Sequence, residues 1–241
     1  MERVQKVISN LGYTSRRNAE KLIDDGKVLI NDRLALIGDK VSNKDVIKID
    51  GIVLDRTEKE KVYFLLNKPR GVVSTVTDDK KRKTIVSLIE TTKRIYPIGR
   101  LDYDTTGVII LTNDGMLTNK LLHPKNNIDK VYLVKVDGLI TGKDIYKLKN
   151  GVVIDGRKTS KSRVKLKKIN KKTKTSLVEI TIHEGRNHQV KKMFESIGYA
   201  VLKLSRIKFA FLDCKGLKSG EYRELTIKEI KKLYSLSENK N

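Results

Sequence analysis

Apolar residues recur at two different periods along this chain of 241 residues, and the period separates predicted helices from predicted strands. Near the start they fall three or four positions apart, which predicts two short helices that end at Gly12 and Gly26. Short apolar runs at 28–31 and 46–49 then predict strands. We therefore expect residues 1–58 to form a small α+β domain.

A larger domain is expected over residues 59–241. The pattern predicts strands at 62–66, 72–76, 108–111, 130–136 and 201–207, two further strands joined by a tip near 170–172, and helices at 84–89, 116–122 and 142–150, after Gly185 and after Thr226. Residues 55–60 are polar and lack periodicity, so we interpret them as the linker between the two domains.

Basic residues outnumber acidic ones and gather in the second domain. The chain carries 52 Lys and Arg against 29 Asp and Glu, a net charge of +23. Residues 1–58 hold 11 basic and 10 acidic side chains, and residues 59–241 hold 41 and 19. We expect a polyanionic partner whose phosphates lie mostly along the second domain. The alternative is a lysine-rich proteome, which needs no such partner.

The composition also excludes several classes of protein. Cys214 is the single cysteine, which rules out an intrachain disulfide framework, and with three histidines it gives no basis for a zinc cluster. No apolar run approaches the roughly 20 residues of a membrane helix, and the charged first residues do not resemble a signal peptide. We expect a cytoplasmic protein that binds neither a metal nor a membrane.

The stretch 96–115 is the strongest candidate for a reactive site. It reads YPIGRLDYDTTGVIILTNDG and sets Arg100, Asp102 and Asp104 on a loop immediately before a buried strand. Rigid elements on both sides of a loop hold a reacting group still. The alternative is a polar turn whose aspartates cap neighbouring backbone N–H groups, and we keep that interpretation for Asp104.

Three further segments accompany this loop. They are NKPRG at 67–71, where a tight turn explains the proline and glycine, KVYLVKV at 130–136, and EGRNHQVKKMF at 184–194. Together with the loop they resemble, in order, the motifs of RsuA/RluB-type ribosomal RNA pseudouridine synthases. The resemblance implies a catalytic domain with a mixed, mainly antiparallel sheet flanked by helices, and an α+β fold for the protein.

The resemblance also implies roles for particular residues. Asp102 matches the catalytic aspartate, Lys191 the basic residue beside it, and Tyr132 the ring that lies against the target base. Leu204 would give the base an apolar wall. The other positions implied to bind substrate around this site are Arg100, Arg186 and Asn187.

No cofactor or metal is expected, since the isomerisation of uridine to pseudouridine transfers neither electrons nor a phosphoryl group. The sequence leaves open whether Asp102 attacks C1′ of the ribose or the reaction follows a glycal route.

The first domain resembles the ribosomal-protein-S4-like RNA-binding domain through the pattern RVQKVISNLGYTSRRNAEKLIDDGKVLIND. The resemblance implies that the second helix and the loop after it meet RNA. The matching residues are Arg16, Arg17, Lys21 and Lys27. A solvated helical face is the alternative. Because this domain is nearly neutral, we expect it to orient RNA more than to supply affinity.

Residues 157–174 contain ten Lys or Arg and no acid. We expect this strand pair to lie along the RNA backbone, with Lys167, Lys168, Lys171 and Lys172 among the contacts. The alternative is a charged edge that keeps the sheet soluble.

The function predicted is isomerisation of one uridine in ribosomal RNA, with the large-subunit RNA favoured, either free or within an assembly intermediate, by a monomeric enzyme. Two other functions compete with it. A non-catalytic RNA-binding or ribosome-assembly protein fits the charge equally well, but gains nothing from a carboxylate at Asp102 in a positive groove. A DNA-binding regulator would use the first two helices, which are short and lie away from most of the charge.

Overall fold

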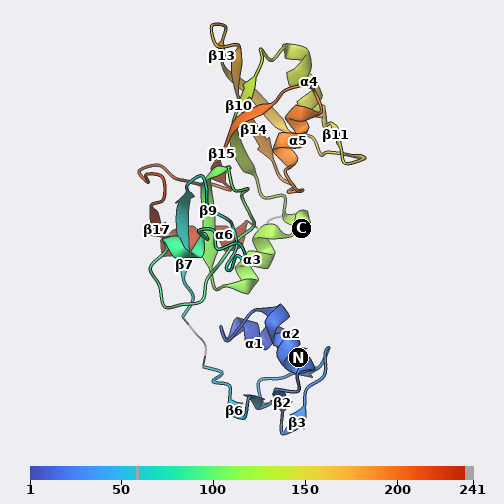
Figure 1. Ribbon diagram of the computed structural model, residues 1–241, viewed down its shortest axis with the longest axis vertical. Helices are drawn as coiled ribbons and strands as arrows, with labels where there is room; N and C mark the ends of the chain where they lie inside the picture. Colours follow the sequence, from blue (N-terminus) through green and yellow to red (C-terminus); the bar gives the residue numbers. More distant parts are fainter. Residues whose placement is uncertain (58–59, 237–241) are drawn as a thin grey trace. The chain divides into compact units, whose positions relative to one another are not determined.

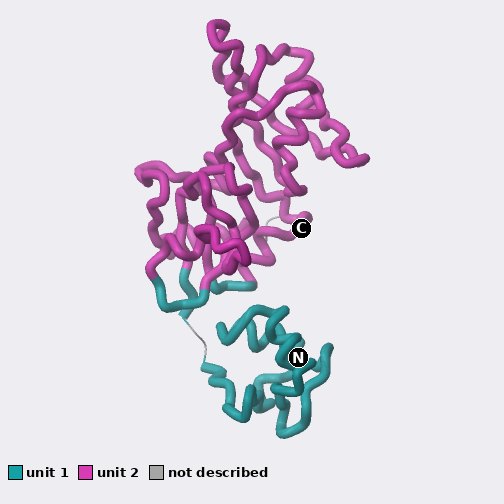
Figure 2. Tube along the Cα trace, in the orientation of Figure 1, with its two compact units in different colours: residues 1–62, 91–94, 113–115 teal, residues 63–90, 95–112, 116–241 magenta. Residues whose placement is uncertain are grey.

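The computed structural model describes residues 1–57 and 60–236, and the chain divides into two compact units (Figure 2). Unit 1 comprises Met1–Val62 with Thr91–Arg94 and Asn113–Gly115, and unit 2 comprises the remainder. The predicted domain boundary between residues 58 and 59 lies outside the described residues.

Unit 1 contains the small α+β domain that the apolar pattern predicts. Its elements are β1 (Glu2–Arg3), α1 (Val4–Asn10), α2 (Arg16–Asp24), β2 (Val28–Ile30), β3 (Arg33–Leu34), β4 (Lys40–Val41), β5 (Ile47–Ile49) and β6 (Ile52–Val53). The side chain of Ser15 accepts a hydrogen bond from the N–H of Asn18 and so caps α2. Apolar residues of both helices and of the β3-β2-β5-β6 sheet form one buried core.

Unit 2 is built on one long sheet (Figure 1). The strands of this sheet are β7 (Tyr63–Lys68), β8 (Tyr96–Pro97), β9 (Thr106–Thr112), β10 (Lys130–Asp137), β13 (Arg163–Asn170), β14 (Thr175–Ile182), β15 (Val201–Phe209), β16 (Leu212–Asp213) and β17 (Tyr222–Glu224). Two short strands, β11 (Val153–Ile154) and β12 (Arg157–Lys158), pair with each other in a separate sheet. The main path runs β13-β14-β10-β15-β9-β7-β17, and only the β15–β9 pair is parallel. The prediction of a mixed, mainly antiparallel sheet is confirmed.

Helices flank both halves of this sheet. They are α3 (Gly115–Leu122), α4 (Gly142–Asn150), α5 (Gln189–Glu195) and α6 (Ile227–Ser235), with single 3₁₀ turns at Val86–Leu88 and Pro124–Asn126. Apolar side chains of α3 and α6 pack on β7 and β9, while α4 and α5 lie beside the β13-β14-β10 half (Figure 1). Within the described residues, no helix is both long and apolar enough to cross a bilayer.

The predicted strand at 72–76 is wrong. Only Val73 forms an isolated bridge, with Thr84, and the rest of the segment bends. The segment is apolar because it packs against the loop before β9: Leu101 is buried there, and its backbone is hydrogen-bonded to the side chain of Ser74. An apolar run predicts burial, whereas a strand also needs a neighbouring strand with which to pair.

The two halves of the sheet meet where β15 runs parallel to β9. Gly107 sits at this point with φ +105°, and a Cβ there would lie 2.2 Å from the carbonyl oxygen of Arg206. The Nε of Arg206 donates across the same junction to the carbonyl of Val108, at 2.7 Å. Gly107 thus stands inside β9, where the absence of a side chain permits the two backbones to approach.

Candidate active site

Hydrogen bonds from the segment that follows β7 hold the loop between β8 and β9 in place. The hydroxyl of Ser74 accepts from the N–H of Leu101 at 3.1 Å and donates to its carbonyl at 2.7 Å. The N–H of Gly71 donates to the carbonyl of Tyr103 at 2.9 Å. These contacts hold the backbone on both sides of Asp102.

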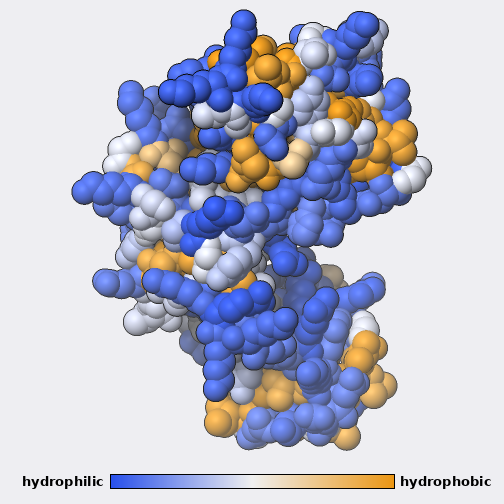
Figure 3. Space-filling model, turned by 45° about the horizontal axis from the view of Figure 1, so that its top comes forward, coloured by the Kyte–Doolittle hydropathy of each residue, from blue (hydrophilic) through white to orange (hydrophobic). Residues whose placement is uncertain are grey.

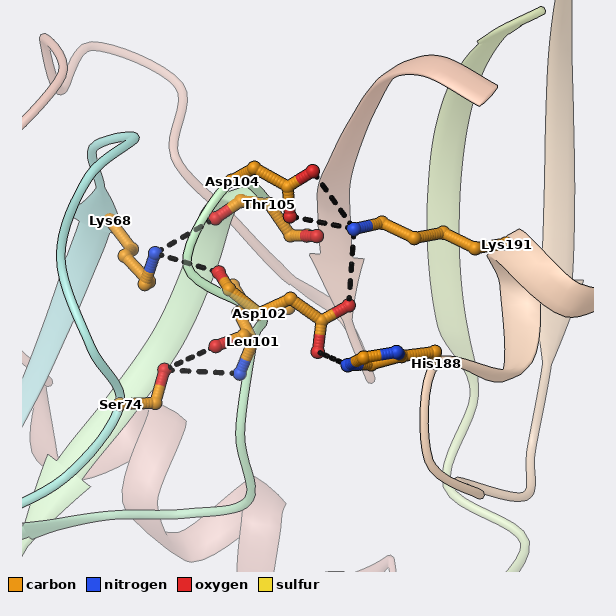
Figure 4. Close-up of polar contacts among 8 residues, drawn as sticks. All are labelled: Lys68, Ser74, Leu101, Asp102, Asp104, Thr105, His188 and Lys191. Carbon is orange, nitrogen blue, oxygen red and sulfur yellow. Dashed lines mark hydrogen bonds and ion pairs between the residues drawn. The ribbon is translucent and has the colours of Figure 1, made fainter. Parts of the chain in front are cut away.

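Lys68 ties the same loop from inside the protein. Its side chain is completely buried, and Nζ donates to the carbonyls of Pro69 and Asp102 at 3.1 Å and of Thr105 at 2.9 Å (Figure 4). Burial lowers the pKa of Lys68 to about 8, and the negative charges of Asp102 and Asp104 partly offset that effect. Lys68 therefore cannot touch RNA. Its role depends on carbonyls up to 37 positions away, which no local pattern reveals.

Asp102 stands between two donors from the start of α5. Its carboxylate is 28% exposed, with one oxygen 3.7 Å from Nζ of Lys191 and the other 3.4 Å from Nε2 of His188 (Figure 4). The structure thus brings Asp102 and Lys191 together, 89 positions apart in the sequence. The sequence did not single out His188.

Lys191 makes its shortest contacts with Asp104. Nζ donates to both carboxylate oxygens of Asp104, at 2.6 and 2.9 Å. The interpretation of Asp104 as a backbone-capping residue is incomplete, because its carboxylate accepts from a backbone N–H and also clamps the lysine. The Lys191 hydrogen bond holds the pKa of Asp104 below its ordinary value. Asp104 thereby fixes the ammonium beside Asp102.

A cavity of about 630 Å³ opens beside Asp102, which is within the usual size of a small-ligand site. The predicted residues that line it are Arg100, Asp102, Tyr132, Arg186, Asn187 and Leu204. Tyr132 and Leu204 lie on paired strands and share a face, because Leu204 pairs with Val134, two positions beyond Tyr132. Both are almost fully buried, so together they form an apolar wall.

The sequence profiles of two families match the chain. The RNA pseudouridylate synthase profile matches residues 62–196, and the S4 domain profile matches residues 2–47. The chain belongs to the RNA pseudouridylate synthase family. It is accordingly an RNA-modifying isomerase, with its reactive loop and the α5 helix inside the matched segment.

Named relatives cover nearly the whole of this synthase. It is 48% identical to the ribosomal large subunit pseudouridine synthase B of Bacillus subtilis (strain 168), over 99% of this chain and 98% of that one. It is 42% identical to the dual-specificity RNA pseudouridine synthase RluF of Escherichia coli (strain K12), over 98% of this chain and 80% of that one. A crystal structure of a pseudouridylate synthase superposes with a TM-score of 0.68 at 32% identity, covering 97% of this chain and all of the other.

Other charged or polar side chains of the synthase that the sequence did not single out also line the cavity, among them Lys130, His188 and Arg206. Nζ of Lys130 donates to the carbonyls of Ile128 and His183, and burial, then the nearby Arg206, lowers its pKa to about 8. Lys130 lies on β10 and Arg206 on the strand that pairs with it, β15. Nothing in the sequence indicates that their side chains line the same cavity.

Arg186 is anchored by the protein itself. Its guanidinium donates twice to the carbonyl of Arg157, at 3.1 and 3.0 Å. Asn187 and Arg100 are exposed at the cavity. Asn187 and Arg100 are therefore better placed than Arg186 to contact the part of a substrate that lies outside the cavity.

The remaining predicted RNA contacts of the synthase lie away from the cavity lining. Arg16, Arg17, Lys21 and Lys27 are exposed on α2 and just after it, in unit 1. Lys167, Lys168, Lys171 and Lys172 are exposed on β13 and on the tip before β14. Lys167 lies 3.6 Å from Glu179 of the paired strand, so it is partly neutralised. Hydrophilic residues cover most of the face drawn in Figure 3.

We predict that Lys68→Met lowers the free energy of unfolding by about 2–3 kcal/mol, because three carbonyls lose their donor inside the protein. Turnover should fall with it, since the Asp102 backbone is released. Chemical denaturation at pH 7 measures the loss, and Lys215→Met, the same change at an exposed lysine, is the control and should have no effect.

The loss should grow with pH. The folded state releases the Lys68 proton near pH 8, whereas an unfolded lysine keeps it to about pH 10.4. Between these values the unfolded state binds more protons, so wild-type stability relative to Lys68→Met rises with pH. Equal deficits at pH 7 and pH 9.5 would show that Lys68 does not titrate there, and no deficit at all would remove it from the support of the loop.

Proposed function

We propose that this synthase converts a uridine of large-subunit ribosomal RNA to pseudouridine, with Asp102 as the reacting carboxylate and without a cofactor. The observation that carries the proposal is the cavity that Asp102, held beside Lys191, lines together with the buried Tyr132 and Leu204. The large-subunit target is supported by the printed name of the Bacillus subtilis relative, which matches this chain over almost its full length.

The reaction breaks the bond between uracil N1 and ribose C1′, turns the base, and joins C5 to C1′. The proton on C5 is lost and N1 gains one, so the change is an isomerisation and its balance requires no redox partner. A carboxylate assists such a step as a nucleophile toward C1′. For that it must be ionised, and Lys191, 3.7 Å away, stabilises the negative charge.

The target base must leave its stack to reach Asp102, which costs a few kcal/mol. Stacking on an aromatic ring contributes about 1–3 kcal/mol per base, so the Tyr132 ring offsets much of that cost. Leu204 closes the apolar side of the same cavity. Bases in RNA loops are already partly free, which makes them the favoured targets.

Affinity for RNA is assigned to surfaces outside the cavity. The hairpin β13–β14 and its tip expose a row of lysines that suits a phosphate backbone. The S4 domain offers the exposed basic face of α2, with Arg16, Arg17 and Lys21. The monomeric state, the cytoplasmic location and the absence of a metal stay predictions from the sequence.

Asp102 also argues against the non-catalytic RNA-binding protein that the sequence left as an alternative. The carboxylates of Asp102 and Asp104 weaken phosphate binding by repulsion, so a protein that only binds RNA gains nothing from them. A synthase needs Asp102 to react and Asp104 to fix Lys191.

We predict that Asp102→Asn abolishes pseudouridine formation while RNA affinity changes by less than about twofold, because the amide is nearly isosteric but cannot act as a nucleophile. Release of the C5 hydrogen from labelled RNA measures turnover. Asp137→Asn, at an exposed aspartate on the end of β10, is the matched control.

The same pair of variants tests the target in cells. Pseudouridine mapping of ribosomal RNA should show a large-subunit site that is lost with the gene, restored by wild type and by Asp137→Asn, and not restored by Asp102→Asn. Substantial turnover by Asp102→Asn contradicts the assignment of the carboxylate, and loss of a site elsewhere contradicts the target.

For the hairpin, we predict that changing Lys167, Lys168, Lys171 and Lys172 together to Gln weakens RNA binding and makes its salt dependence shallower. Each phosphate contact contributes a log–log slope of roughly 0.7–0.9, so the slope should fall by roughly two to three units. A decrease near two units is favoured, because Lys167 is already partly neutralised by Glu179. Turnover at saturating RNA should persist.

The control carries the same charge change on another surface, with Lys215, Lys218, Lys228 and Lys231 replaced by Gln. Its salt slope should stay closer to that of wild type. Parallel salt lines and equal affinity for wild type and the hairpin variant would make the hairpin a solvated edge of the sheet.

A further inference from the structure

His188 contacts the proposed catalytic carboxylate and has no role in the account so far. Its Nε2 lies 3.4 Å from one oxygen of Asp102, while Nζ of Lys191 lies 3.7 Å from the other (Figure 4). Both side chains come from the first turn of α5, three positions apart, so they reach the carboxylate from one rigid element. The imidazole also lines the cavity.

The backbone at this position is one that few residues other than glycine adopt. His188 is the N-cap of α5 and has φ +52° and ψ 28°, in the left-handed region where asparagine, aspartate and histidine are the commonest exceptions to glycine. Its side chain makes no capping hydrogen bond. Capping preferences therefore do not account for the imidazole, whereas its contact with Asp102 does. Strained backbone of this kind gathers at active sites.

Lys191 alone holds Asp102 only loosely. Its ammonium is bound closely by both oxygens of Asp104 and lies 3.7 Å from Asp102. His188 supplies a second contact, on the other carboxylate oxygen.

We propose that His188 is a positioning residue for the isomerisation. The inference rests on the proposed function, in which Asp102 reacts. The imidazole Nε2 lies 3.4 Å from one oxygen of Asp102 and Nζ of Lys191 lies 3.7 Å from the other, so the two side chains together hold the carboxylate in one orientation toward the ribose.

Two substitutions separate this role from a structural one. His188→Asn and His188→Gly both suit the left-handed backbone, so the melting temperature should stay the same or rise. Turnover at pH 7.5 should nevertheless fall by about tenfold, the loss expected of one group that orients a reacting residue. RNA affinity should change by less than about twofold.

Ala210→Gly is the matched control. Ala210 also has a left-handed backbone, with φ +54°, but it follows β15 and does not line the cavity. Relief of strain there should raise the melting temperature and leave the turnover as in wild type.

The experiment measures melting temperature, RNA affinity and turnover at saturating RNA at pH 7.5 for wild type, the two His188 variants, Ala210→Gly and Asp102→Asn. His188 variants that turn over more slowly but are neither destabilised nor weaker in RNA binding support the inference. His188 variants with wild-type turnover overturn it, as do variants whose turnover falls only in step with their melting temperature or their RNA affinity. Retained turnover in Asp102→Asn counts instead against the proposed function, so the two failures are distinguishable.

Discussion

The ammonium of Lys191 is the interaction on which the site depends. It binds both oxygens of Asp104 and lies within ion-pair distance of Asp102, so one cation organises two carboxylates of the same loop (Figure 4). The two negative charges repel one another, and the ammonium between them offsets that repulsion. Because only 18% of the Lys191 side chain is exposed, solvent weakens these contacts little.

The same contact joins the two halves of the sheet. Lys191 belongs to α5, beside the β14–β10 half, while its partners belong to the loop that leads into β9. In the sheet itself the halves are joined by the short parallel pair of β15 and β9, where Gly107 lets the backbones approach. Buried Lys68 holds the loop from the other side. The cavity therefore lies at a junction whose shape is set by contacts between segments far apart in the chain.

The sequence predicted what local pattern determines. Periodicity located most strands and helices, including α4 at its observed bounds, and the motifs directed attention to Asp102 and Lys191. Contacts between residues far apart in the sequence could not be predicted from local patterns. Asp104 and Lys191 are 87 positions apart, and nothing near Asp104 distinguishes a clamp from a cap. The 72–76 segment was assigned to a strand because burial and pairing give the same apolar pattern.

A double-mutant cycle on Asp104 and Lys191 tests the central claim most directly. Lys191→Met, Asp104→Asn and the double variant are compared with wild type for turnover at saturating RNA. If Asp104 acts by holding Lys191 beside Asp102, Lys191→Met lowers turnover by about tenfold or more, near 1.4 kcal/mol, and Asp104→Asn lowers it less. The double variant is then no slower than Lys191→Met alone. Wild-type turnover in Asp104→Asn, or losses that multiply in the double variant, would contradict the account.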